Sequence, residues 1–306
     1  CLAGGVALNC VANGKILNNS NFEKLWIQPA SGDAGGALGA AQVFWFNDKK
    51  NQRKINIDNE DSMMGSFLGP KFNEETIEKN LKSLNATYEK ISEKDLIETV
   101  AKEISKEKAV GWFQGRMEFG PRALGSRSII ADPRSSKMQN DLNLKIKFRE
   151  SFRPFAPSVL KEKSLDYFNL NDDSPYMLLT CKINKKKILN SNTDILTGFD
   201  KLGEKRSTIP AVTHVDYSAR VQTVDAKTNP KFHALLSEFN KITGCPVLIN
   251  TSFNIRGEPI VCSIEDSFNC FMGTNLDILV IENFILYKDG QKKSVNLNYK
   301  KKFNLD

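Results

Sequence analysis

Closely spaced cysteines are missing from this sequence. Its 306 residues include six cysteines, but no two of them form a CxxC pair. A chain of this length is also far larger than the small scaffolds that disulfides hold together. We therefore expect reduced thiols in the core of a cytoplasmic protein.

Long hydrophobic runs are missing as well. The longest apolar run is well short of the roughly 18 residues that a membrane-spanning helix needs, and no signal peptide is visible. Hydrophobic residues make up 40% of the chain and charged residues 26%, which is usual for a globular protein. We expect no membrane partner.

Acidic residues are fewer than basic residues in this sequence. The 43 lysines and arginines outnumber 36 acidic residues and give a net charge of +7. This excess indicates an anionic partner, but it does not distinguish nucleic acid from a small phosphate. Five of the lysines lie in residues 291–306, where we expect a solvated basic tail.

Composition divides the chain into four parts. Residues 1–47 are rich in glycine and alanine, and residues 48–66 are polar and charged, so we interpret them as a linker. Helical and strand patterns alternate over residues 67–287, which predicts an α/β or α+β domain. The basic tail takes up residues 288–306.

The ends of several elements can be read from local signals. Residues 92–105 begin with Ser92 in capping-box spacing and carry apolar residues on one face. Residues 229–244 have Asn229 to cap a helix and Gly244 to end it. The first ten residues, "CLAGGVALNC", predict a strand that runs into a glycine turn. Because this chain opens inside an element and with cysteine, we expect it to have lost an N-terminal part.

Four arginines lie close together in residues 115–134, "GRMEFGPRALGSRSIIADPR". Pro121 restricts the turn before Arg122, and Gly125 lets another backbone approach closely. A rigid turn suits a cradle for an anion, because a mobile arginine loses about 2 kcal/mol of rotamer free energy when it clamps a ligand. We therefore expect Arg122 to belong to an anion site rather than to a solvated surface.

A second basic segment, "KFRESFRPFAPSVL", spans residues 147–160. Lys147, Arg149 and Arg153 alternate there with phenylalanines, which predicts partial burial. Buried cations need partners, so the alternative to anion binding is neutralisation by acidic residues nearby. The acidic candidates are Glu118, Asp132 and Glu150.

Polar residues follow two further predicted strands. "HVDYSARVQTV" contributes His214 and Arg220, and "NTSFNIRGEPIV" contributes Asn250 and Ser252. Hydroxyls, amides and backbone N–H groups after a strand suit phosphate or carbonyl oxygens, although they are also ordinary turn residues. Because each basic or polar cluster lies at the end of a predicted strand, we expect the clusters to converge on one pocket.

Together these motifs resemble the C-terminal domain of the O-carbamoyltransferase family, which includes nodulation-type and antibiotic-tailoring enzymes. The likeness runs in order over nearly all of residues 67–285 and rests on long motifs, among them "GPRALGSRSIIADPR" and "TGCPVLINTSFNIRGEPIV". It implies an α/β fold of the YrdC-like type. "GGVALN" and "ASGDAGGALGAA" resemble the end of the family's N-terminal domain, an actin/sugar-kinase-like (ASKHA) fold of the threonylcarbamoyl-transferase type.

The resemblance implies an activity and a set of residues. The family binds carbamoyl phosphate and ATP, the latter with Mg²⁺, forms a carbamoyl-adenylate, and passes the carbamoyl group to a hydroxyl of a sugar or natural product. The implied activating residues are Arg122, Lys147, Arg153, Arg220 and Ser252. The implied cofactor-binding residues are Gly4, Gly5, Asn9, Asn250 and His214.

The resemblance also implies a catalytic Fe²⁺ in the N-terminal domain, and Asp33 matches one of its ligands. The family's HxxxH pair is absent here, because the two histidines are His214 and His233. We therefore expect the chain to be roughly the C-terminal half of a longer enzyme. The alternative is a shortened paralogue that has lost the transfer chemistry.

Three other functions remain as alternatives. A threonylcarbamoyl-adenylate synthase of tRNA modification is disfavoured by the "GDAGGALGAA" segment ahead of the main domain. A nucleic-acid-binding module would spread basic residues among exposed aromatics, whereas the key arginines lie in stiff turns, so we expect no nucleic-acid partner. A catalytically silent partner subunit would keep the fold but bind carbamoyl phosphate poorly.

Overall fold

One mixed β-sheet organises the protein. The computed structural model describes residues 1–53, 62–170, 172–189, 198, 202, 204–292 and 299–303. The sheet has nine strands in the order β1-β9-β8-β2-β3-β7-β4-β6-β5. The strands are β1 (Glu89–Lys90), β2 (Val110–Phe113), β3 (Arg127–Ala131), β4 (Ala156–Leu160), β5 (Leu179–Lys182), β6 (Ser218–Val224), β7 (Val247–Ser252), β8 (Ile278–Ile281) and β9 (Phe284–Tyr287).

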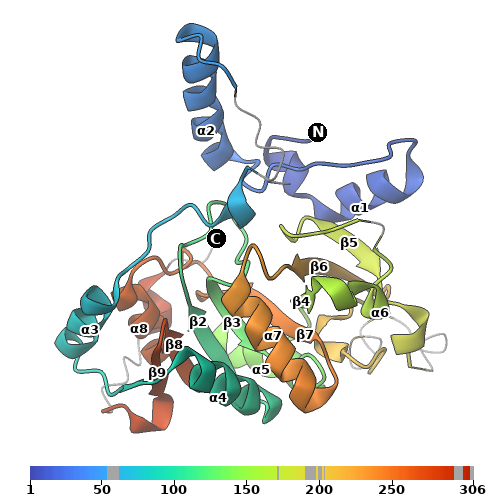
Figure 1. Cartoon of the computed structure of the whole chain (residues 1–306). Coiled ribbons are helices and arrows are strands. Elements are labelled where there is room, and N and C mark those ends of the chain that lie inside the picture. The colour runs from blue at the N-terminus through green and yellow to red at the C-terminus, as the bar shows by residue number, and fades with distance from the viewer. Residues whose placement is uncertain are drawn as a thin grey trace.

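Helices cover this sheet and extend beyond it (Figure 1). The helices are α1 (Cys10–Asn19), α2 (Asp33–Val43), α3 (Glu74–Ser83), α4 (Glu93–Ser105), α5 (Met138–Asp141), α6 (Ser164–Tyr167), α7 (Pro230–Thr243) and α8 (Ile264–Gly273). Helices α4 and α7 lie side by side, and α8 packs against β8 and β2. The mixed α/β class predicted from the alternating patterns is confirmed. No helix in the described ranges has the length and apolar character to cross a membrane.

The capping signals correctly predicted the ends of two of these helices. Ser92 precedes α4 and its hydroxyl accepts a hydrogen bond from the Asp95 N–H, while the apolar face of the helix is buried. Asn229 caps α7 by accepting from the Phe232 N–H, and Gly244 ends that helix in the left-handed conformation. Both predictions are confirmed because local hydrogen bonds define the helix ends.

The two ends of the chain differ from expectation. Residues Gly5–Leu8 form a 3₁₀ helix (η1) before α1, and the predicted strand is reduced to a single bridge between Leu2 and Ile27. The basic tail is not simply solvated, because Tyr299 is buried in the main core. An aromatic ring in a lysine-rich stretch can bury itself while the charged groups stay in water. The predicted linker, 48–66, lies partly outside the described residues.

The helix α2 stands away from the rest of the chain (Figure 1). None of its residues is buried, and η2 (Phe44–Asp48), which follows it, exposes Phe44 and Trp45. The segment rich in glycine and alanine thus forms a helix without a buried residue. The glycine and alanine side chains leave too little apolar surface to hold it against the sheet.

Replacing Gly125 tests how tightly the β2–β3 loop packs on α7. Gly125 has a φ of +104°, and a Cβ there would lie 2.3 Å from the Phe232 ring. We expect Gly125→Ala to lower the free energy of unfolding by about 2–4 kcal/mol, because backbone strain and overpacking add. The control is Gly115→Ala, at a φ of +52° in open space, for which we expect about 1 kcal/mol. Urea unfolding of both variants measures the difference, and equal losses would contradict the close contact.

Candidate anion-binding site

Four arginines share one pocket beside the central strands. The cavity has a volume of about 340 Å³, and Arg122, Arg149, Arg153 and Arg220 all line it. None of the described residues that line it carries a carboxylate. Such an arrangement is typical of a site for an anion with several negative charges.

The strand register explains why distant segments meet here. Ala156 at the start of β4 lies opposite Asn250 near the end of β7, and Ser158 of β4 lies opposite Gln222 of β6. Arg220 precedes Gln222 by two residues, so it projects from the same face of β6. The start of β4, the end of β7 and Arg220 are thereby placed at one edge of the pocket.

Burial and mutual repulsion lower the pKa values of two of these arginines. Burial, and then the neighbouring Arg122, lowers the pKa of Arg220 to about 10. Burial, and then Arg153, lowers the pKa of Arg149 to about 10 as well. Both groups therefore stay protonated at neutral pH, and an incoming anion would relieve their repulsion.

The turn that carries Arg122 is held by a buried carboxylate. Glu118 Oε1 accepts hydrogen bonds from the backbone N–H groups of Leu124 (2.7 Å), Ser126 (2.8 Å) and Arg127 (3.3 Å). Burial raises the pKa of Glu118. Backbone N–H groups thus occupy this Glu118 oxygen. Arg122 itself donates a hydrogen bond to the Leu8 carbonyl (3.2 Å).

The other three arginines of residues 115–134 have structural partners. Arg127 is fully buried, stacks on Phe113 with 3.5 Å to the ring centre, and donates to the carbonyl of Gln114 at 2.9 Å. Arg134 pairs with Asp132 at 2.6 Å, and Arg116 donates to the Gly69 carbonyl. Of these three, only Arg134 is paired with an acidic residue, whereas Arg116 and Arg127 donate to backbone carbonyls; Arg122 alone of the four lines the pocket.

A buried asparagine shapes the second basic segment. Asn143 lies in η4 (Leu142–Ile146), and its amide nitrogen donates to the carbonyls of Ser151 (2.9 Å) and Arg153 (2.8 Å). Its amide oxygen accepts from Arg149 Nε at 2.6 Å. Sequence reasoning missed Asn143, because nothing in its local pattern distinguishes it from a core-facing helix residue.

Lys147 lies behind the pocket wall rather than on it. Its Nζ donates to the Ser252 carbonyl (2.5 Å), the Asn254 carbonyl (2.8 Å) and Asn254 Oδ1 (2.7 Å). Burial, and then Arg149, lowers the pKa of Lys147 to about 7. The ammonium group therefore fixes the loop that presents Ser252 to the cavity.

Polar side chains complete the wall. Asn250 Nδ2 donates to Ser158 Oγ (3.0 Å) and Gln222 Oε1 (2.8 Å), while Asn250 Oδ1 has no hydrogen-bond partner among the described residues. His214 also lines the cavity; it contacts Ser218 Oγ at 3.1 Å, and burial lowers the pKa of its imidazole. Of the ten residues predicted outside the metal site, six line this pocket, namely Arg122, Arg153, Arg220, Ser252, Asn250 and His214.

The remaining N-terminal candidates lie elsewhere. Gly4 and Gly5 border open space, Asn9 caps α1 by accepting from the Ala12 N–H at 3.1 Å, and Asp33 is the exposed first residue of α2. Within the described ranges, no three or more His, Cys, Asp or Glu side chains gather as a possible metal site. The iron site that the resemblance implies at Asp33 therefore stays a prediction. Sequence reasoning also missed Cys10, which reaches the arginine pocket from the start of α1.

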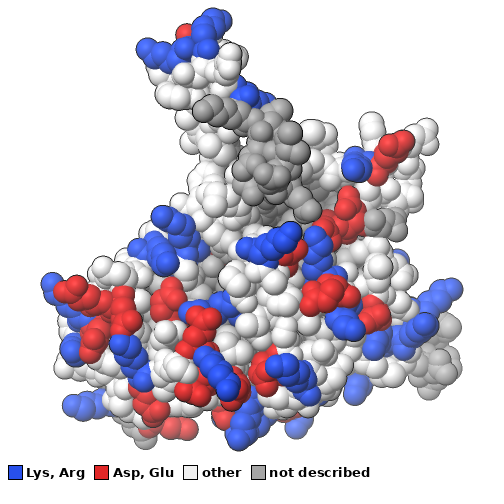
Figure 2. Space-filling model, viewed as in Figure 1, with Lys and Arg blue, Asp and Glu red and all other residues white. Residues whose placement is uncertain are grey.

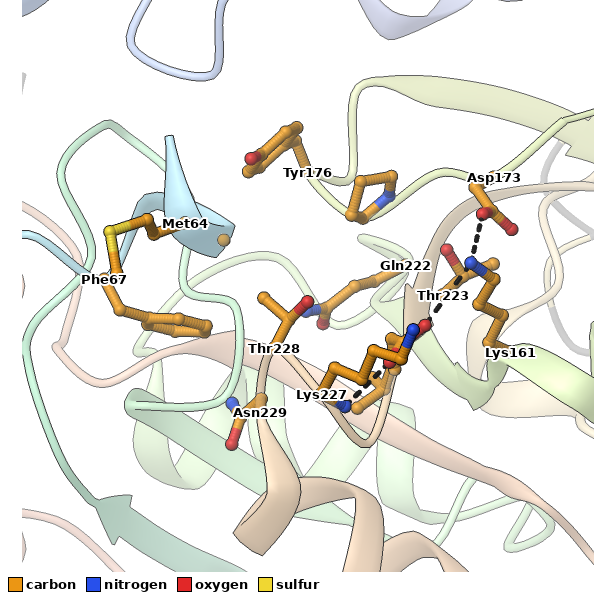
Figure 3. A pocket seen from close by; sticks show the side chains of 14 residues that line it. Met64, Phe67, Lys161, Asp173, Tyr176, Gln222, Thr223, Lys227, Thr228 and Asn229 are labelled. Atoms are coloured by element: carbon orange, nitrogen blue, oxygen red, sulfur yellow. Dashed lines mark hydrogen bonds and ion pairs between the residues drawn. The ribbon is translucent and has the colours of Figure 1, made fainter. Parts of the chain in front are cut away.

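A second cavity of about 390 Å³ lies beside Gln222, which is one of its lining residues (Figure 3). Phe67 and Tyr176 line it together with Lys161, which pairs with Asp173 at 2.6 Å. Its two lysines are offset by two aspartates that also line it. This cavity lacks the concentrated positive charge of the arginine pocket.

Comparisons with known proteins agree with the motifs. A family model described as carbamoyltransferase C-terminus matches residues 101–288, and one described as carbamoyltransferase N-terminus matches residues 1–42. An uncharacterized protein of Synechocystis is 53% identical over the whole chain. The nodulation proteins NolO of Bradyrhizobium diazoefficiens and NolNO of Sinorhizobium fredii are each 38% identical over 94% of it.

These relatives are much longer. The chain covers 50% of the Synechocystis protein, 49% of NolO and 39% of NolNO, so it spans half or less of each. The resemblance inferred from the motifs is confirmed, since the C-terminal family model alone matches most of the chain. The chain belongs to the carbamoyltransferase family.

Proposed function

We propose that the arginine pocket binds carbamoyl phosphate and ATP and forms a carbamoyl-adenylate, from which the carbamoyl group passes to a hydroxyl acceptor. The observation that carries this proposal is the cluster of four arginines in a pocket whose described lining has no carboxylate. Charge-assisted hydrogen bonds stabilise such complexes by about 1.5–3 kcal/mol each. Membership of a carbamoyltransferase family supports the choice of carbamoyl donor.

The chemistry needs charge neutralisation rather than a side-chain nucleophile. Carbamoyl phosphate supplies the carbamate unit and its phosphoryl group goes to water as phosphate. A carbamate oxygen then attacks the α-phosphorus of ATP, and pyrophosphate leaves. Catalysis of this kind rests on positioning and on stabilising the charge that develops. The guanidinium groups of Arg122, Arg149, Arg153 and Arg220 fill that role in our proposal.

The uncharged wall residues suit the carbamoyl end of the donor. A carbamoyl NH₂ group needs acceptors, and Asn250 Oδ1 is a buried acceptor without a described partner. Ser252 Oγ lies beside it on β7 and can accept from the carbamoyl NH₂ group, because its own proton goes to Asn254 Oδ1. His214 stays neutral near pH 7, since burial lowers the pKa of its imidazole, so it can hydrogen-bond the nucleotide without adding charge.

The transfer step belongs to the N-terminal segment in our proposal. Gly4, Gly5 and Asn9 would contact a nucleotide there, and Asp33 matches a ligand of the family's iron, as the family resemblance implies. We assign no step to iron, because the described residues bring no ligand set to Asp33. The same proposal includes a YrdC-like fold for the main domain, an actin/sugar-kinase-like fold for the N-terminal segment, and a sugar or natural product as the acceptor.

The charge pattern disfavours a nucleic-acid-binding module. On the face shown in Figure 2, lysines and arginines intermingle with acidic residues instead of forming a continuous basic stripe. A nucleic-acid groove tracks a backbone with positive charge and exposed aromatic rings. The four pocket arginines are instead gathered in one small cavity.

Arg153→Ala tests the pocket directly. Arg153 is exposed at the rim, and its side chain makes no hydrogen bond to another described residue, so its loss should leave the fold intact. We expect carbamoyl-phosphate-dependent ATP–pyrophosphate exchange to fall at least about tenfold, as the loss of one charge-assisted hydrogen bond predicts. Arg116→Ala, another exposed arginine that lies in the first basic motif and outside the pocket, is the matched control and should keep the wild-type rate. Exchange at the wild-type rate in Arg153→Ala would remove Arg153 from the site.

The pH dependence of exchange tests Lys147. With a pKa of about 7, Lys147 is charged below that pH and loses its proton above it. Arg149 and Arg220, with pKa values of about 10, stay charged throughout. We therefore expect kcat/KM for carbamoyl phosphate to fall about tenfold from pH 6 to pH 8 as the protonated fraction falls. Lys147→Met should be slow and flat over this range, and the same falling limb in that variant would contradict the assignment.

A further inference from the structure

The end of the chain returns to the main domain. Tyr299 opens η10 (Tyr299–Lys302) and is only 3% exposed. Its ring lies on Gly273, the last residue of α8, where an added Cβ would approach the ring to 2.2 Å. Phe303 packs edge-on against the same ring at 5.5 Å. The close fit between the ring and bare backbone anchors this segment.

The Tyr299 hydroxyl reaches the loop that follows β7. It donates a hydrogen bond to Glu258 Oε1. Glu258 Oε2 accepts from the Ile255 N–H at 2.8 Å, and the Glu258 carbonyl accepts from Asn254 Nδ2 at 2.6 Å. The Glu258 carboxylate thus links Tyr299 to the backbone of Ile255, and the Glu258 carbonyl links the same residue to Asn254.

The same loop contacts the pocket wall. Asn254 Oδ1 accepts from Ser252 Oγ at 2.6 Å and from Lys147 Nζ at 2.7 Å. Ser252 lines the arginine pocket. A second contact runs in parallel, because Lys300 Nζ lies 5.4 Å from the ring centre of Phe148, between Lys147 and Arg149 in the sequence.

We propose that Tyr299 is a positioning residue for the arginine pocket. Acting through Glu258 and Asn254, it sets the loop that orients Ser252 and Lys147 toward the anion. The proposal rests on the function proposed above. Tyr299 lies beyond residue 288, where the match to the carbamoyltransferase C-terminus ends, so it is a feature of this chain that the family match does not contain.

Charge couples the same residues. Glu258 faces Tyr299, Cys270 and Lys147, and its pKa is raised by burial and lowered by the Tyr299 hydrogen bond. Lys147 faces Arg149, Arg153, Cys270 and Glu258. Without the Tyr299 hydroxyl, Glu258 holds its proton to higher pH. An uncharged Glu258 stabilises the Lys147 ammonium less, so the pKa of Lys147 should fall.

The experiment compares Tyr299→Phe with Tyr88→Phe in the full chain. Tyr88 is the matched control. Its hydroxyl also donates to a glutamate (Glu78, 3.3 Å), and neither residue lines the pocket. We expect Tyr299→Phe to lower carbamoyl-phosphate-dependent exchange about tenfold and to move the falling limb of its pH profile to lower pH. Tyr88→Phe should change neither. Identical rates and profiles in the two variants would overturn the proposal.

Two further measurements keep the test decisive. If thermal unfolding shows that Tyr299→Phe does not fold, Glu258→Gln replaces it, and an unshifted pH profile in that variant overturns the proposal. If the wild-type chain shows no exchange, the proposed function fails by itself. The effect of Tyr299 on Lys147 is then measured by ¹⁵N NMR titration of labelled lysines. Tyr299→Phe should lower the pKa of the Lys147 amine. An unchanged pKa would overturn the proposal.

Discussion

Repulsion among four guanidinium groups is the constraint on which the rest of the structure depends. Burial and neighbouring arginines lower the pKa of Arg149 and Arg220 to about 10, which means that folding holds these cations together against an electrostatic cost. A ligand with several negative charges removes that cost on binding. The strain that the fold maintains is therefore the source of the affinity that we assign to the pocket.

The acidic neighbours are placed so that they hold the pocket without neutralising it. Glu118 accepts backbone N–H groups, Asp132 pairs with Arg134, and Glu150 pairs with Arg256 at 3.2 Å. The second basic segment is shaped by the neutral Asn143. Glu118 and Asn143 fix backbone that carries pocket arginines, and none of the three carboxylates lines the pocket. Preorganisation of this kind lowers the entropy lost on binding.

Local signals predicted much of this structure, and long-range contacts account for what they missed. Alternating patterns gave the α/β class, and caps gave α4 and α7, because helix ends depend on neighbours within a few residues. The basic clusters do converge on one pocket, although not all of them follow a strand: Arg153 precedes β4, and Arg220 lies within β6. Whether Lys147 faces the cavity or lies behind it depends on how one loop turns, which no motif encodes. Likewise, the burial of Tyr299 depends on a distant glycine, Gly273.

A crystal structure with carbamoyl phosphate and a non-hydrolysable ATP analogue tests the central claim most directly. Our account predicts phosphate density in the cavity that Arg122, Arg149, Arg153 and Arg220 line, with Ser252 at its edge. It also predicts no such density in the second cavity, where Lys161 is already paired. Phosphate bound only at Lys161, or an empty arginine pocket at saturating ligand, would contradict the account.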